Sequence, residues 1–157
     1  MKTLVIGYGN SSRCDDGVGW FVVERLEALA LSDVEFLTAH QLEVDQAEAL
    51  SRFDNVIFVD AAVPQSPRPI TETVVQPRLQ SHAVAHYLTP EDLVSLSDTL
   101  YGHVPRAFLF SIRGEDFSFA TNLSAATEQR ALEAVRQIAQ RVADLQHQTL
   151  NTHGVAG

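Results

Sequence analysis

The stretch GYGNSSRCDDGVG, from Gly7 to Gly19, decides the fold of this chain. It follows the short apolar run Leu4–Ile6 and precedes a segment in which apolar residues recur at helical spacing. This is the pattern of a strand, a tight turn and the start of a helix, which opens an α/β domain. Two adjacent carboxylates, those of Asp15 and Asp16, lie in the turn.

The composition limits what kind of protein this is. The chain has 157 residues, 45% of them hydrophobic and 20% charged, as in an ordinary soluble domain. No apolar run is long enough to cross a bilayer, and no signal peptide precedes the first strand. The single cysteine, Cys14, excludes an internal disulfide and fits a reducing compartment, and the net charge of −9 argues against nucleic-acid binding. We expect a cytoplasmic monomer that binds neither nucleic acid nor a membrane.

Strand patterns and helix patterns alternate along the chain. The pattern predicts strands over residues 2–6, 34–38, 55–59, 70–76 and 106–112, and helices over residues 17–30, 45–51, 89–102 and 124–147. Such alternation predicts a three-layer α/β fold: a mostly parallel, twisted five-stranded sheet with helices on both faces, and residues 70–76 at an edge. We expect residues 1–147 to form one domain and residues 148–157 to form a flexible tail.

Three residues that are distant in sequence are candidates for a common site. In sheets of this type, ligands bind beyond the carboxyl ends of the strands, where the strand order reverses. Asp16 follows the first strand and Asp60 ends the third, so we expect both at the same edge of the sheet. Together with His86, on a loop before a helix, they could hold a divalent ion and leave positions open for water or substrate.

Each candidate also has a plainer explanation. Asp60 can cap a neighbouring turn, Asp16 or Asp15 can face the positive end of the first helix, and a lone loop histidine is more often simply exposed. His82 is the alternative imidazole. We expect the other histidines to be surface or structural residues: His40, His103, His147 and His153.

Other kinds of site receive less support. A dinucleotide loop of the form GxGxxG would need glycine at the position of Ser12, and the two aspartates would repel phosphate. Cys14 lies near a helix start, but the adjacent carboxylates disfavour its thiolate. There is no HExxH, CxxC or GxSxG motif either, so the hydrolase classes that carry them are not indicated.

Several short motifs, taken in order, resemble the hydrogenase maturation proteases, the endopeptidases that trim the large subunit of nickel–iron hydrogenases. That family opens with a strand, a GxGN turn, an acidic pair and a glycine-rich helix start, and continues with a VDA motif and a histidine-leucine block before a proline-led helix. The matching segments are Gly7–Asn10, Asp15–Asp16, Gly17–Gly19, Val59–Ala61, His86–Pro90 and Leu100–Gly102 with Pro105. The resemblance covers about residues 1–142.

The resemblance implies a function and a site. It implies a hydrolase, a peptidase of aspartic type by family assignment, that removes the C-terminal peptide of a nickel–iron hydrogenase large-subunit precursor after nickel insertion. Asp16, Asp60 and His86 would be the catalytic and metal-contacting residues, and the nickel would be supplied by the substrate. Several relatives have a glycine-threonine turn where this chain has His40–Leu42, so the resemblance does not carry the family's substrate contacts over to these residues.

Two alternatives remain open from sequence. One is a non-catalytic chaperone that checks for nickel on the same large subunit, and the other is a nucleotide-binding α/β module. Whether the protein is a peptidase or a chaperone, we expect the hydrogenase large subunit to contact loops around the crevice at the carboxyl ends of the strands. These loops lie near Gln41, 64–69 and 114–122.

Overall fold

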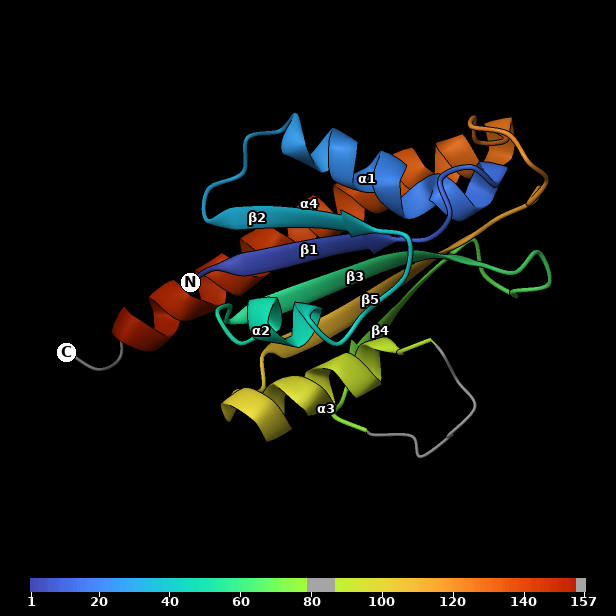
Figure 1. Ribbon diagram of the computed structural model, residues 1–157. Helices are drawn as coiled ribbons and strands as arrows, with labels where there is room; N and C mark the ends of the chain where they lie inside the picture. The colour runs from blue at the N-terminus through green and yellow to red at the C-terminus, as the bar shows by residue number, and fades with distance from the viewer. Residues whose placement is uncertain (79–86, 155–157) are drawn as a thin grey trace.

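A five-stranded sheet forms the centre of the structure, a computed structural model that describes residues 1–78 and 87–154 (Figure 1). The strands are β1 (Thr3–Tyr8), β2 (Val34–Ala39), β3 (Asn55–Ala62), β4 (Ile70–Val75) and β5 (Arg106–Arg113). Their order in the sheet is β2-β1-β3-β5-β4. All neighbouring pairs are parallel except β4 with β5, which is antiparallel and places β4 at the edge. The predicted mostly parallel sheet with residues 70–76 at its edge is confirmed.

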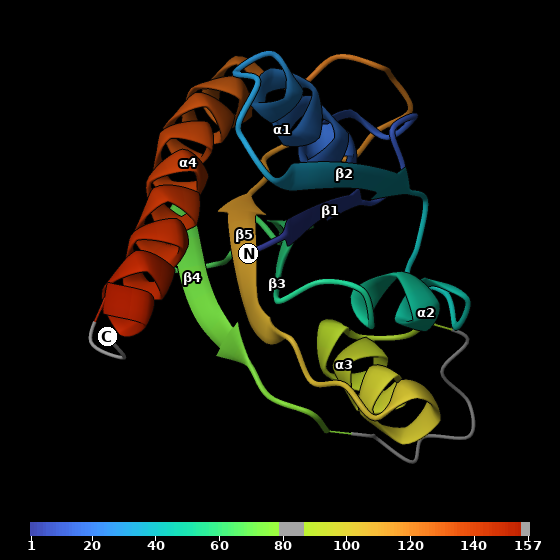
Figure 2. The ribbon, with the colours of Figure 1, turned by 90° about the vertical axis from the view of Figure 1, so that its left-hand side faces the viewer.

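Helices cover both faces of this sheet. They are α1 (Val18–Glu27), α2 (Gln46–Leu50), α3 (Pro90–Tyr101) and α4 (Ala125–Gly154), and a short 3-10 turn, η1 (Cys14–Gly17), precedes α1. Helices α1 and α4 lie on one face, whereas α2 and α3 lie on the other (Figures 1 and 2). The predicted three layers are therefore confirmed. No helix within residues 1–78 and 87–154 is long and apolar enough to cross a membrane.

Alternation along the strands divides the core into two clusters. Val5 and Ile57 pack with the buried residues of α1 and α4, whereas Ile6 and Phe58 pack with those of α2 and α3. All four side chains are fully buried. Because successive residues of a strand point to opposite faces, an apolar run can fill both clusters at once, which explains why these strands are apolar throughout.

The helix ends follow local chemistry. Thr89 caps α3 through a reciprocal capping box with Asp92, and Gly102 ends that helix at φ 67°. Helix α1 stops at Glu27, earlier than predicted, and the chain after it turns through positive φ at Ala30 and Asp33. Leu29, which falls within the predicted helix over residues 17–30, lies beyond α1 and is 51% exposed.

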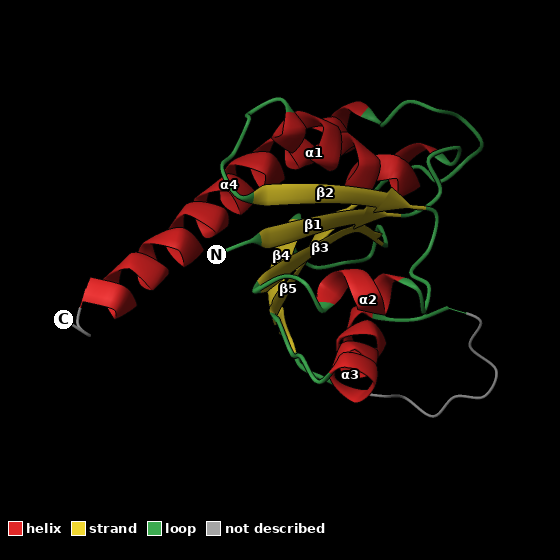
Figure 3. Cartoon of the chain, turned by 60° about the vertical axis from the view of Figure 1, so that its left-hand side comes forward, coloured by secondary structure: helices red, strands yellow, loops and turns green. Residues whose placement is uncertain are grey.

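Helix α4 differs from the prediction in the opposite sense. It continues to Gly154, beyond the helix end at residue 147 that the sequence pattern predicts (Figure 3). No proline or glycine interrupts the sequence from Ala125 to His153, so nothing local ends the helix before Gly154.

The start of α1 lies directly against β1. A methyl group added at Gly7 would lie 2.2 Å from the carbonyl oxygen of Gly19, and one added at Gly19 would lie 2.6 Å from the carbonyl oxygen of Val59. Only residues without a side chain allow these backbones to approach so closely. This packing brings the turn with Asp16 next to the end of β3.

Candidate functional site

The carboxyl ends of β1 and β3 form the point at which the strand order reverses. From β1 the chain passes to β2 on one side, and it returns to β3 on the other. A cavity of about 400 Å³ opens there, lined by residues from these strand ends, the turn after β1, the loop after β2 and the approach to α3. Its lining includes Tyr8, Arg13, Asp16, His40, Asp60 and Tyr87. This is where open α/β sheets bind their ligands.

Asp60 is a carboxylate held in a largely buried setting at the end of β3. The Tyr8 hydroxyl donates a hydrogen bond to its Oδ2 at 2.9 Å, and the Ser111 hydroxyl donates to its Oδ1 at 3.0 Å. Burial raises the pKa of Asp60 to about 6, the two hydrogen bonds oppose this rise, and the charges of Asp16 and Glu91 add to it. Burial, with the charge of Asp60 next in importance, also raises the pKa of Tyr8, which keeps that hydroxyl a donor. Asp60 is therefore an ion at neutral pH that gains by meeting a cation.

Asp16 lines the same cavity with one oxygen free. The backbone N–H of Asn10 donates to its Oδ2 at 2.7 Å, and no residue of the described chain donates to its Oδ1. Asp16 and Asp60 thus line one cavity, at the same edge of the sheet, where the sequence pattern predicts both residues. Two carboxylates in one cavity can in principle serve as ligands for a divalent ion, or as an acid and a base.

Asp15 has a different task from its neighbour. It is fully buried, and its carboxylate accepts five hydrogen bonds. The donors are the backbone N–H groups of Glu115, Asp116 and Ser124 and the hydroxyl groups of Ser124 and Thr127. Burial by itself would raise the pKa of Asp15, but the hydrogen bonds outweigh it and lower the pKa to about 2. Asp15 therefore ties the turn after β1 to the loop before α4 and, through the Thr127 hydroxyl, to the first turn of that helix.

The third predicted residue, His86, lies outside the described residues, as does its alternative, His82. Within residues 1–78 and 87–154, no group of three or more histidine, cysteine, aspartate or glutamate side chains could hold a metal ion. The described part of the site therefore consists of two carboxylates, and their role as metal ligands remains a prediction.

Three residues of the site had not been expected from sequence. Tyr8 and Ser111 hold the Asp60 carboxylate, and His40, which we had assigned to the surface or a structural role, lines the cavity. Tyr8 follows an apolar run and sits inside the GYGN motif, which is the signal that could have drawn attention to it. His103 is structural as expected, because its ring lies 2.6 Å from the carbonyl oxygen of Phe53.

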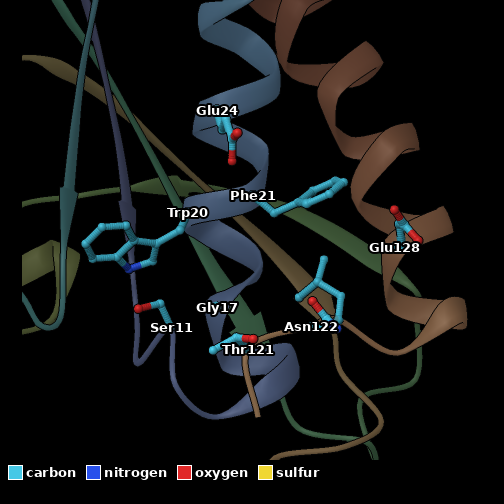
Figure 4. Close-up of a pocket in the computed structure, with 9 residues that line it drawn as sticks. Ser11, Gly17, Trp20, Phe21, Glu24, Thr121, Asn122 and Glu128 are labelled. Carbon is cyan, nitrogen blue, oxygen red and sulfur yellow. The ribbon is translucent and has the colours of Figure 1, made fainter.

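A second cavity, of about 470 Å³, lies beside the starts of α1 and α4 (Figure 4). Although it is larger, neither Asp16 nor Asp60 lines it. Trp20 lines this cavity, and its indole N–H donates to the carbonyl oxygen of Gly9 at 3.0 Å. The indole therefore supports the turn that carries Asn10 and Asp16, while the paired carboxylates mark the smaller cavity as the candidate site.

The fold that places these carboxylates is the fold of hydrogenase maturation endopeptidases. HybD from E. coli matches with a TM-score of 0.73 over 92% of this chain and 93% of its own, at 21% identity. HycI from Thermococcus kodakarensis KOD1 matches with a TM-score of 0.69 over 88% and 90%, at 23% identity. A hydrogenase 2 maturation peptidase from Thaumarchaeota archaeon SCGC_AB-539-E09 has a TM-score of 0.67 over 90% and 98%, at 21% identity.

These matches establish the fold at low sequence identity. No model of a known protein family matches the chain, and no curated protein sequence matches it significantly. The fold that the short motifs imply by resemblance is thus confirmed over 88–92% of the chain.

Proposed function

We propose that this protein is a hydrogenase maturation endopeptidase. It removes the C-terminal peptide of a nickel–iron hydrogenase large-subunit precursor once nickel has been inserted. The observation that carries the proposal is the meeting of Asp16 and Asp60 in one cavity at the strand-order switch of this particular fold.

The nickel belongs to the substrate in this proposal. The Oδ1 of Asp16, to which none of the described residues donates, approaches an open position of the nickel. The carboxylate of Asp60 approaches another, and His86 supplies an imidazole by resemblance to the family. An oxygen and nitrogen set complements an ion that the precursor holds partly through thiolates. Because a cation beside Asp60 offsets the cost of its buried charge, the carboxylate favours a nickel-loaded substrate over an empty one.

The reaction is hydrolysis of one peptide bond. The bound nickel fixes the position of the scissile bond, and it can polarise the carbonyl or acidify the attacking water. A carboxylate of Asp16 or Asp60 can accept the proton of that water. Hydroxide adds to the carbonyl carbon, the C–N bond breaks, and the leaving nitrogen takes a proton. No serine, threonine or cysteine is among the described residues that line the cavity, and the Ser111 hydroxyl, which lies outside that lining, donates to Asp60. This arrangement disfavours an acyl-enzyme.

The test compares precursor with and without nickel. Nickel-loaded and nickel-free large-subunit precursors are incubated with the protein, and the mass of each C-terminus is measured. We expect loss of the C-terminal peptide from the nickel-loaded precursor alone. Efficient cleavage without nickel would contradict recognition through the metal. A stable complex whose mass never changes would identify a nickel-checking chaperone instead.

The two loop histidines are separated by paired substitutions. We expect His86→Ala to abolish cleavage and His82→Ala to retain it, because only His86 occupies the family's histidine position. The opposite pattern would transfer the role to His82. Both variants are measured on the same nickel-loaded precursor, with thermal unfolding as the check that they fold.

A further inference from the structure

We infer that Arg13 binds a carboxylate of the peptide substrate and thereby positions that peptide in the candidate site. This inference rests on the proposed function and adds a residue that is separate from the metal-contacting set. Arg13 lines the same cavity as Asp16 and Asp60, and it is the only lysine or arginine among the described residues that do so.

The Arg13 side chain is held in place from two directions. Its Nε–H donates to the carbonyl oxygen of Phe117 at 3.1 Å, and its guanidinium carbon lies 4.7 Å from the centre of the Phe119 ring. Contacts of both kinds orient the plane of a guanidinium group. Arg13 is exposed, so this orientation is set at the surface of the cavity, where an incoming peptide can reach it.

The backbone beneath Arg13 is anchored as well. The N–H of Arg13 donates to the carbonyl oxygen of Asn10 at 3.1 Å, and Arg13 forms a parallel bridge with Ala120. The next residues bind the same loop, because the Cys14 N–H donates to the Ala120 carbonyl oxygen at 2.8 Å and Asp15 accepts four of its five hydrogen bonds there. The fifth comes from Thr127 in the first turn of α4. Arg13 is therefore positioned before any substrate arrives, which lowers the cost of ordering it on binding.

The terminal nitrogens of Arg13 remain available. Apart from the bond from Nε, the guanidinium donates to no residue that the structure describes, and it forms no ion pair with Asp16 or Asp60. Although the chain has a net charge of −9, the Arg13 guanidinium forms no ion pair with the described carboxylates, including the two that line the same cavity. Arg13 does not neutralise Asp16 or Asp60, so we infer that the partner of its guanidinium is a group of the bound substrate.

A carboxylate is the group that this arrangement favours. The two terminal nitrogens of a guanidinium present parallel N–H donors that match both oxygens of a carboxylate. A substrate carboxylate elsewhere in the cavity would meet the like charges of Asp16 and Asp60, which disfavour it. Arg13 therefore favours a substrate that carries a carboxylate and determines where in the cavity that carboxylate binds. An acidic side chain and the C-terminal carboxylate of the precursor have this chemistry in common.

The experiment measures cleavage of nickel-loaded precursor by Arg13→Met and Arg13→Lys. We expect Arg13→Met to raise KM by about tenfold with kcat changed by less than about twofold, and Arg13→Lys to recover part of that loss. The matched control is Arg25→Met. Arg25 also stacks on an aromatic ring, that of Phe21 at 4.9 Å, but does not line the cavity, so its KM should not change.

Changes in the substrate identify the carboxylate. Precursors whose acidic residues near the cleaved end are replaced by amides are compared with a precursor whose C-terminus is amidated. One of the two changes should raise KM for the wild-type protein and have no further effect on Arg13→Met, because both partners of one contact have then been removed. Equal KM values for wild type and Arg13→Met, or a loss in kcat alone, would overturn the inference.

Binding measured without catalysis separates this inference from the proposed function. The affinity of nickel-loaded precursor is determined by calorimetry for wild type, Arg13→Met and Arg25→Met. If the precursor binds in an Arg13-dependent manner but is not cut, the endopeptidase proposal fails and Arg13 keeps its role. If it is cut and bound equally well by wild type and Arg13→Met, the endopeptidase stands and the role of Arg13 is refuted. If the precursor does not bind to the wild-type protein at all, both fail.

Discussion

At the scale of single residues, three aspartates with identical side chains have been given different chemistry by their surroundings. Asp15 is saturated with hydrogen-bond donors and has a lowered pKa, whereas Asp60 is buried with two hydroxyl donors and has a raised pKa. Asp16 accepts a backbone hydrogen bond on Oδ2, and none of the described residues donates to its Oδ1. A lowered pKa marks a carboxylate whose charge stabilises the folded protein, and a raised pKa marks one whose charge destabilises it. Destabilised charges of the second kind are common in active sites.

Replacing Asp60 by asparagine should therefore stabilise the protein at neutral pH. Its pKa in the folded state, about 6, lies above the ordinary value of 3.8, so the folded protein binds more protons between these values and loses stability as pH rises through this window. At about pH 8 we expect Asp60→Asn to raise the free energy of unfolding by about 1–3 kcal/mol over wild type. The gain should vanish below about pH 3, where wild-type Asp60 is protonated in both states.

Denaturant unfolding of wild type and Asp60→Asn at both pH values measures this difference. The lower end of the range allows for an amide nitrogen that cannot accept a hydrogen bond from one of the two hydroxyls. A destabilisation of equal size at both pH values would show that the Asp60 carboxylate supports the fold instead of being strained by it.

Replacing Asp15 by asparagine should have the opposite effect. Its pKa in the folded state is about 2, below the ordinary 3.8, so its stabilising effect is present above the ordinary value and is lost as pH falls through about 2. Asp15→Asn should lower the free energy of unfolding at neutral pH by about 3 kcal/mol, because buried donors lose a charged acceptor. Asp16→Asn is the matched control, and it should change stability by less than about 1 kcal/mol, since Asp16 accepts one backbone hydrogen bond.

At the scale of elements, the site depends on how closely the start of α1 approaches β1 and β3. The contact through Gly7 and Gly19 has no room for a side chain. On the other side of the turn, residues of the loop between β5 and α4 hold Asp15 and Arg13. The turn is thus fixed between two elements, which keeps Asp16 near Asp60 without any direct bond between the carboxylates.

Two glycine-to-alanine substitutions distinguish the effect of close backbone packing, at Gly19, from the effect of positive φ, at Gly102. A methyl group at Gly19 would lie 2.6 Å from the Val59 carbonyl oxygen and 2.9 Å from the Tyr8 nitrogen, so Gly19→Ala must move a helix or a strand. We expect it to cost about 3 kcal/mol or more. Gly102→Ala has open space around it but a φ of 67°, so it should cost only about 1 kcal/mol. Thermal unfolding of both variants measures the difference, and similar losses would contradict the importance of the close contact.

At the scale of the whole molecule, periodicity and strand alternation were sufficient to predict the layers and the edge to which Asp16 and Asp60 belong. These predictions needed only that parallel strands end at a common edge. The ends of α1 and α4 were less predictable. No glycine or proline marks the turn at Ala30, where φ is positive, and none marks an end of α4 before Gly154.

The partners of the site residues could not be predicted, because they depend on the register between strands. Ser111 reaches Asp60 because these two residues are directly paired between β5 and β3. His40 reaches the cavity because Tyr8 and Ala39 are paired at the ends of β1 and β2. The donors to Asp15 are at least 100 residues away in sequence, so no local pattern could distinguish Asp15 from Asp16.

The central claim is that Asp16 and Asp60 act together on a nickel-loaded hydrogenase precursor. The most direct measurement is the mass of the precursor's C-terminus after incubation with wild type, Asp16→Asn, Asp60→Asn and, as a control, Asp98→Asn, whose side chain is exposed on α3. We predict that wild type and Asp98→Asn release the C-terminal peptide, while both site variants remain folded and leave the precursor intact. Cleavage at the wild-type rate by either Asp16→Asn or Asp60→Asn would contradict the claim.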